Sequence, residues 1–165
     1  MNSTVKVCFV CLGNICRSPL AQGVFEALVK EEGLQDRIII SSAGVSGWHV
    51  GNPPDARMLQ TARDHGIHLN SRARQFQSSD FEQMDLVLAM DHSNLSALNQ
   101  MSAEPELQDK LFLFRSFDPQ HNNDLEVPDP YYGGGKGFET VYQIVDRTCP
   151  KVLDHLKAQL AKKHE

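Results

Sequence analysis

The stretch with the clearest chemical potential is C-L-G-N-I-C-R-S, in which Arg17 follows Cys11 by six residues. An apolar, β-branched run precedes it and a helical pattern follows, which predicts a tight loop between a buried strand and a helix N-terminus. At such a loop, backbone N–H groups and the positive end of the helix dipole form a site for a tetrahedral dianion. The same field favours a thiolate, so Cys11 is a candidate nucleophile.

The other residues of this loop suit phosphate binding. Arg17 can fold back over the loop and grip two phosphoryl oxygens with its planar fork, which a lysine could not do. Gly13 and Asn14 supply the flexible or left-handed backbone that the turn needs. Ser18 can donate a hydrogen bond to the thiolate and so ease the departure of the sulfur when its bond to phosphorus breaks. The predicted phosphate-binding loop comprises Leu12, Gly13, Asn14, Ile15, Cys16, Arg17 and Ser18.

Alternating strand and helix patterns surround the loop. Apolar runs predict strands over residues 5–10, 37–42, 84–90 and 111–114. Helical spacing predicts helices from Ser18 to about Val29, over residues 55–65, up to about Met101 after a cap at Asp91 or Ser93, and over residues 138–160. Glycine- and proline-rich loops are predicted over residues 43–54 and 118–135. This alternation indicates an α/β protein with an open parallel sheet, in one domain over residues 1–165.

The composition limits the partners. A net charge of −5 argues against a nucleic-acid surface, and no apolar run is long enough to span a membrane. The N-terminal apolar stretch is interrupted by Lys6 and a Gly-Asn turn, so we interpret it as a buried strand and not as a signal peptide. We therefore expect a cytoplasmic protein, in which the four cysteines are reactive or buried thiols and not structural bridges.

Two motifs resemble one known family. V-C-L-G-N-I-C-R-S-P-L-A, which contains Cys11, resembles the signature of the low-molecular-weight protein-tyrosine phosphatases, and D-P-Y-Y with F-E-x-V-Y resembles their acid-loop region. The likeness extends over residues 5–156. It implies a three-layer α/β/α fold with a flavodoxin-like four-stranded parallel sheet, in the order 2-1-3-4, and flanking helices. It also implies hydrolysis of phosphotyrosine and aryl phosphates through a phosphocysteine, with no cofactor and no metal.

Asp129, in V-P-D-P-Y-Y, is the candidate general acid, and the family comparison places the acid there. Phosphoryl transfer to Cys11 leaves a phenolate that needs a proton. Asp129 can supply it and then, as a base, activate the water that hydrolyses the phosphocysteine. Without the cysteine loop, an aspartate between prolines would be an ordinary turn residue.

Five residues are candidates for the walls of the substrate cleft. They are Leu12, Trp48, His49, Tyr131 and Tyr132. A deep slot with aromatic sides favours a flat phenyl phosphate and leaves phosphoserine too short to reach the floor. The resemblance supports Trp48 and Tyr131 most directly. The expected partners are tyrosine-phosphorylated proteins, with phosphate and other oxyanions as inhibitors, and the expected state is a monomer or a weak dimer.

The resemblance also suggests residues behind the loop. Asn14 and Ser42 resemble the hydrogen-bonding pair that holds the family's phosphate loop in shape. Ser71 stands where the family has a histidine that contacts this support, a departure that bears on the stiffness of the loop and not on its chemistry.

The remaining cysteines have different predicted roles. The resemblance suggests that peroxide joins Cys16 to Cys11 in a reversible disulfide, which would shield Cys11 from irreversible oxidation. Cys8 and Cys149 are interpreted as buried hydrophobic residues.

Four alternatives stay open. An arsenate reductase of similar fold would need resolving cysteines, and residues 72–110 contain none. In a phosphoarginine phosphatase of the same family, the residue at the position of Ile15 would resemble threonine. Ile15 and Tyr131 therefore favour phosphotyrosine. A non-catalytic phosphotyrosine-binding module would lack the nucleophile or the acid. A metal site built from the three N-terminal cysteines is disfavoured because a strand alternates their directions.

Overall fold

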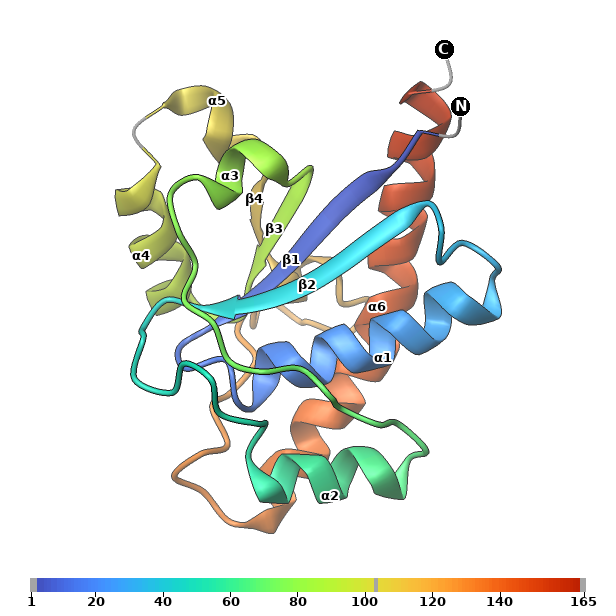
Figure 1. Ribbon diagram of the computed structural model, residues 1–165. Coiled ribbons are helices and arrows are strands. Elements are labelled where there is room, and N and C mark those ends of the chain that lie inside the picture. Colours follow the sequence, from blue (N-terminus) through green and yellow to red (C-terminus); the bar gives the residue numbers. More distant parts are fainter. Residues whose placement is uncertain (1–2, 103, 164–165) are drawn as a thin grey trace.

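The computed structural model describes residues 3–102 and 104–163. Its four-stranded sheet has the order β2-β1-β3-β4, and every neighbouring pair is parallel (Figure 1). The strands are β1 (Val5–Cys11), β2 (Ile38–Gly44), β3 (Leu86–Ala89) and β4 (Leu111–Leu113). The predicted parallel sheet and its strand order are confirmed.

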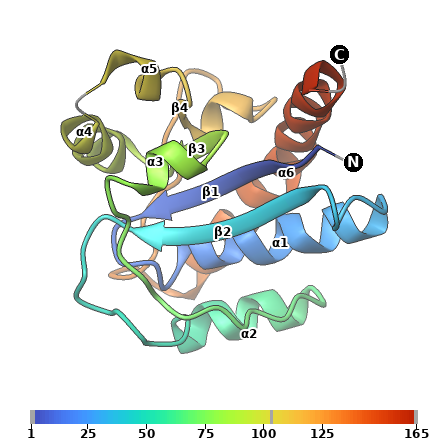
Figure 2. The same cartoon turned by 45° about the horizontal axis from the view of Figure 1, so that its top comes forward.

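Helices cover both faces of the sheet. They are α1 (Arg17–Glu31), α2 (Ala56–Asp64), α3 (Asp80–Gln83), α4 (His92–Met101), α5 (Pro105–Gln108) and α6 (Gly135–Lys163), with a 3-10 helix η1 (Phe114–Phe117). Helices α1 and α6 lie on one face, and α3, α4 and α5 lie on the other (Figures 1 and 2). The three-layer arrangement is therefore confirmed, but the four-residue elements α3, α5 and η1 were not predicted, because so short a helix leaves no 3.6-residue periodicity.

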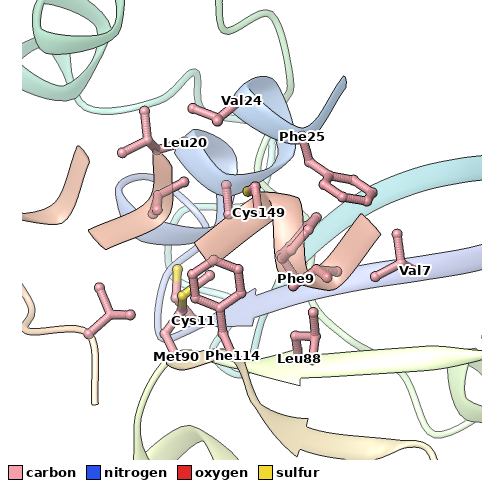
Figure 3. Close-up of a cluster of buried hydrophobic side chains, with 14 of the residues drawn as sticks. Val7, Phe9, Cys11, Leu20, Val24, Phe25, Leu88, Met90, Phe114 and Cys149 are labelled. Carbon is pink, nitrogen blue, oxygen red and sulfur yellow. The ribbon is translucent and has the colours of Figure 1, made fainter. Parts of the chain in front are cut away.

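Strand β1 divides its side chains between two cores. Val7, Phe9 and Cys11 face α1 and α6, whereas Cys8 and Val10 face the opposite side, as the period of two requires. Figure 3 shows Cys11 at the margin of the α1–α6 core, near Phe114 and Met90. The nucleophile candidate is thus carried on a strand end that is fixed by packing on both faces.

A buried ion cluster fixes the start of the second long loop. Asp118 is fully buried and accepts hydrogen bonds from Arg147 of α6, at 2.8 and 2.9 Å, and from Arg115 of η1, at 3.0 Å. Burial alone would raise the pKa of Asp118, but the hydrogen bonds from Arg147, Arg115 and the Gln120 backbone hold that pKa at about 2. The acidic loop that follows therefore begins from a rigid point.

In the described part of the chain, no helix combines the length and the apolar character needed to cross a membrane.

Candidate active site

The predicted phosphate loop lies between β1 and α1, at the carboxyl end of the sheet. Cys11 is the last residue of β1 and Arg17 the first of α1, and Asn14 between them has a φ of 59°. This left-handed backbone was predicted for the turn. At Gly13 the constraint is space and not backbone conformation, because a Cβ there would lie 2.9 Å from His49 Cδ2. Cys16, the N-cap of α1, makes no side-chain cap, so the first amides of the helix stay available for an anion.

A hydroxyl lies beside the Cys11 sulfur. Cys11 Sγ is 2.9 Å from Ser18 Oγ, and both side chains are buried. Asn14 Nδ2 donates to the same Ser18 oxygen at 2.8 Å and to Ser42 Oγ at 3.0 Å. Ser18 has one hydrogen to donate, and its other acceptor, the Ala43 carbonyl, is more distant at 3.5 Å. The geometry therefore favours donation from Ser18 to the sulfur.

The support behind the loop continues through residues that the sequence did not indicate. Asn14 Oδ1 accepts from the backbone N–H of Arg74 at 3.0 Å, and Ser42 donates to Gln22 Oε1 at 2.5 Å. Gln22 of α1 and the Arg74 backbone thus hold the pair, in a chain that has Ser71 and not the family's histidine. The amide of Gln22 gave no sequence signal, because a polar residue on a helix is ordinarily a solvated one.

Arg17 is buried beside the pocket and remains charged. Its Nη1 donates to Asp91 Oδ2 at 2.8 Å and to the Val127 carbonyl at 3.0 Å. Burial acts to lower the pKa of Arg17, but the fields of Cys11 and Asp129 and the hydrogen bond to Asp91 outweigh it and raise that pKa above its ordinary value. The guanidinium is therefore held in one orientation as a permanent cation.

Asp91 has a second role beyond the helix cap predicted for it. Its Oδ1 accepts from the Asn94 N–H and caps α4, while its Oδ2 holds Arg17. The signal that could have found this contact is position, because Asp91 closely follows β3 at the carboxyl edge of a parallel sheet, where ligand sites gather.

Asp129 comes from the long loop and faces the same pocket. Its side chain is 35% exposed, and its Oδ2 lies 3.5 Å from Arg17 Nη2. Its Oδ1 accepts from the Tyr131 N–H at 3.0 Å. Two residues earlier, the buried Val127 donates its N–H to the Met90 carbonyl at 2.8 Å, which fixes this part of the loop beside β3.

One pocket unites the predicted residues. It encloses about 450 Å³ of space, part of it open to solvent. Its lining consists of Cys11, Leu12, Gly13, Ile15, Cys16, Arg17, Ser46, Trp48, His49, Asp129, Tyr131 and Tyr132. All five predicted cleft residues are in that set, with Trp48 and Tyr132 as exposed rim residues, and Ser46 was not predicted. Asn14 and Ser42 lie behind it.

The cysteines differ in their surroundings. Cys16 lines the pocket with Cys11, and burial, followed by the fields of Asp55, Cys11 and Asp129, raises the pKa of its thiol well above the usual value. Cys8 and Cys149 are fully buried, as predicted, and burial raises the pKa of Cys8 to about 11.

The cysteines also bear on the metal alternative. Cys8 faces the opposite side of the sheet from Cys11 and Cys16. Within residues 3–102 and 104–163, no group of three His, Cys, Asp or Glu side chains is placed to hold a metal ion.

Comparisons with known proteins show which family the sequence and the fold resemble. A sequence model described as "Low molecular weight phosphotyrosine protein phosphatase" matches residues 6–164. The low molecular weight protein-tyrosine-phosphatase of Streptomyces coelicolor is 44% identical over 158 residues, which cover 95% of this chain and 96% of that protein. A protein tyrosine phosphatase structure from Entamoeba histolytica, with Hepes in its active site, has a TM-score of 0.90 at 36% identity and covers 94% of this chain and 99% of that one.

A Drosophila arginine phosphatase structure is also similar, with a TM-score of 0.84 at 37% identity, covering 92% of this chain and 97% of that one. The phosphatase match thus extends over almost the entire chain, in sequence and in fold. The chain belongs to the low molecular weight phosphotyrosine protein phosphatase family, whose members are hydrolases.

Proposed function

We propose that this protein hydrolyses phosphotyrosine in proteins, and aryl phosphates generally, through a phosphocysteine on Cys11. The observation that carries the proposal is the meeting of Cys11, Arg17 and Asp129 around one pocket, although Asp129 comes from a loop distant in sequence. A nucleophile, a cation and a carboxyl group in one cleft are what two-step phosphoryl transfer requires.

In the first step, Cys11 Sγ attacks phosphorus and the bond to the phenolic oxygen breaks. The Ser18 hydroxyl, 2.9 Å from the sulfur, and the nearby Arg17 cation stabilise the attacking thiolate. Arg17 also neutralises charge on the equatorial phosphoryl oxygens, together with the loop amides at the start of α1. Because Asp91 and the Val127 carbonyl orient its fork beforehand, little reorganisation is needed when the substrate binds.

Asp129 completes both steps. Protonated, it gives its proton to the departing phenolate. Ionised, it then takes a proton from the water that attacks the phosphocysteine and returns Cys11 as a thiolate with inorganic phosphate.

Replacement of Asp129 by asparagine tests this role. We expect kcat/KM for phenyl phosphate to fall about a hundredfold or more, because its phenolate leaves poorly without a proton. The loss should be smaller for para-nitrophenyl phosphate, whose anion is stable. Asp124→Asn, an exposed change in the same loop, is the matched control. Equal losses for the two substrates would contradict the assignment.

The walls of the pocket select a ring. Leu12 and Tyr131 line the same pocket as the buried Cys11, while the Trp48 and Tyr132 side chains in its lining are exposed. A phenyl phosphate is long enough to reach a buried sulfur, whereas a phosphoserine side chain is shorter. The Drosophila arginine phosphatase makes phosphoarginine the alternative substrate. The apolar Ile15 in the pocket wall disfavours phosphoarginine, because the guanidinium group of that substrate would need a polar partner.

The substrate class can be measured directly. Phosphate release from phosphotyrosine, phosphoserine and phosphoarginine peptides should be compared with and without chelator, beside arsenate reduction with added thiol. Chelator-resistant activity that prefers phosphotyrosine is expected. Preference for phosphoarginine, turnover of arsenate, or tight phosphotyrosine binding without turnover would each overturn the proposal.

We also propose that Cys16 protects Cys11 during oxidation. Peroxide oxidises the Cys11 thiolate to a sulfenic acid with release of hydroxide, and the Cys16 thiol then forms the disulfide with loss of water. The raised pKa keeps the Cys16 thiol protonated, which makes Cys16 itself a poor target for peroxide. We place this reaction in the cytoplasm, a reducing compartment in which the disulfide would form only transiently.

Recovery from peroxide tests this protection. We expect the parent to regain most of its activity when thiol is added, and Cys16→Ser to regain a much smaller fraction of its own starting activity, because its sulfenic acid proceeds to the irreversible sulfinic acid. Mass spectrometry should show the loss of two hydrogens in the parent. Recovery of the variant to the same fraction as the parent would contradict the role.

A further inference from the structure

The first turn of α2 touches the loop that carries Asp129. Arg57 Nη2 donates to the Tyr131 carbonyl at 3.1 Å. The Arg57 guanidinium carbon lies 5.5 Å from the centre of the Tyr131 ring and 4.7 Å from that of Phe138, in the first turn of α6. One arginine therefore contacts the backbone and the ring of a pocket residue, and also the helix into which the loop leads.

Arg57 is itself held from the phosphate-loop side. Asp55 accepts from Arg57 Nε at 3.1 Å and from Nη2 at 2.9 Å, and it also caps α2 through the Arg57 backbone N–H. The Asp55 backbone N–H donates to the carbonyl of Ile15, inside the phosphate loop, at 2.8 Å. A continuous path thus connects Ile15, Asp55, Arg57 and Tyr131.

The loop needs such a connection on its C-terminal side. Residues 118–134 contain no helix or strand. Upstream of Asp129, the Val127 N–H is bound to the Met90 carbonyl. Downstream, Gly133 and its two following glycines are exposed. Apart from the hydrogen bond of the Gly133 N–H to the nearby Pro130 carbonyl, at 3.0 Å, the chain has glycine's backbone freedom there until α6 begins at Gly135. Arg57 meets the chain just before those glycines.

We propose that Arg57 is a positioning residue that holds Asp129 and Tyr131 in register with the phosphate loop. The inference rests on the proposed function, since it concerns the placement of the proton donor. Asp129 Oδ1 is bonded to the Tyr131 N–H, so a shift of Tyr131 moves the carboxyl group directly. Small misplacements of a catalytic group cost large factors in rate. Lysine could not substitute, because the planar fork serves Asp55 and the carbonyl while its face covers two rings.

The test compares Arg57→Lys and Arg57→Met with Arg63→Lys and Arg63→Met, which change an exposed arginine in the last turn of the same helix. We expect kcat/KM for phenyl phosphate to fall about tenfold in the Arg57 variants, with a loss of about twofold for para-nitrophenyl phosphate. Inhibition by inorganic phosphate should be unchanged, because the phosphate loop is intact. The Arg63 variants should match the parent.

The outcomes of this test distinguish failure of the positioning role from failure of the proposed function. Equal losses for both substrates, or Arg57 variants that match their Arg63 counterparts while the parent is active, would overturn the positioning role and leave the proposed function standing. A parent that is folded but inactive would overturn both. Thermal melting of each variant separates a fall in stability from a change in substrate dependence. Unfolding lowers the activities with phenyl phosphate and para-nitrophenyl phosphate by the same factor.

Discussion

Turnover of phosphotyrosine is expected to fall at least about ten-thousandfold when Cys11 is replaced by serine, because the nucleophile of both steps is lost. A serine hydroxyl stays protonated beside Ser18, and the loop provides no base to activate it. The pocket should keep its shape, since Cys11 ends a strand that is packed on both faces. Inorganic phosphate and phosphotyrosine peptides should therefore still bind. Single-turnover phosphate release and calorimetric binding measure the two effects.

The matched control is a cysteine that does not reach the pocket. Cys149 is fully buried in α6, and Cys149→Ala removes a thiol at the cost of a small cavity. This variant should retain activity near that of the parent. Substantial turnover by Cys11→Ser, or equal losses in the two variants, would exclude the phosphocysteine mechanism.

Replacement of Arg17 by lysine is expected to lower kcat/KM about a thousandfold, because an ammonium cannot reproduce the fork. Lysine keeps a positive charge but cannot hold Asp91 and the Val127 carbonyl while presenting two further donors to the phosphoryl group. The affinity for inorganic phosphate should fall with it, which distinguishes this variant from Cys11→Ser. Kinetics with para-nitrophenyl phosphate and competition by phosphate measure both quantities.

Arg63→Lys is the control for the same chemical change on an exposed helix surface. It should leave both quantities unaltered. If Arg17→Lys retained activity within about tenfold of the parent, charge alone would account for phosphate binding and the bidentate contact would lose its support.

Much of the fold followed from local patterns. The apolar runs and the helical spacing predicted the parallel sheet and the longer helices, because buried strands and amphipathic helices must show those periods. A flexible or left-handed backbone was predicted at Gly13 and Asn14, and of the two Asn14 adopts the left-handed conformation. The short elements α3, α5 and η1 escaped prediction, since tertiary contacts and turn geometry determine them.

The support of the phosphate loop shows the limit of reasoning from single positions. Ser71 stands where a histidine was expected, and this departure bore on the loop's stiffness. The structure provides two other contacts, from Gln22 and from the backbone of Arg74. A hydrogen bond depends on which groups the fold brings together, and a backbone donor leaves no mark in the residue type.

The sequence by itself determined the chemistry that is available: a thiol and an arginine on one short loop before a helix, and an aspartate among prolines much later in the chain. Residue type and spacing carry that information because loop, helix dipole and nucleophile are local neighbours. Only the tertiary structure decided that Asp91 orients Arg17, that Asp129 reaches the same pocket, and that Arg57 connects the two loops. These contacts join segments far apart in sequence, and their geometry is set by how the sheet and helices pack together.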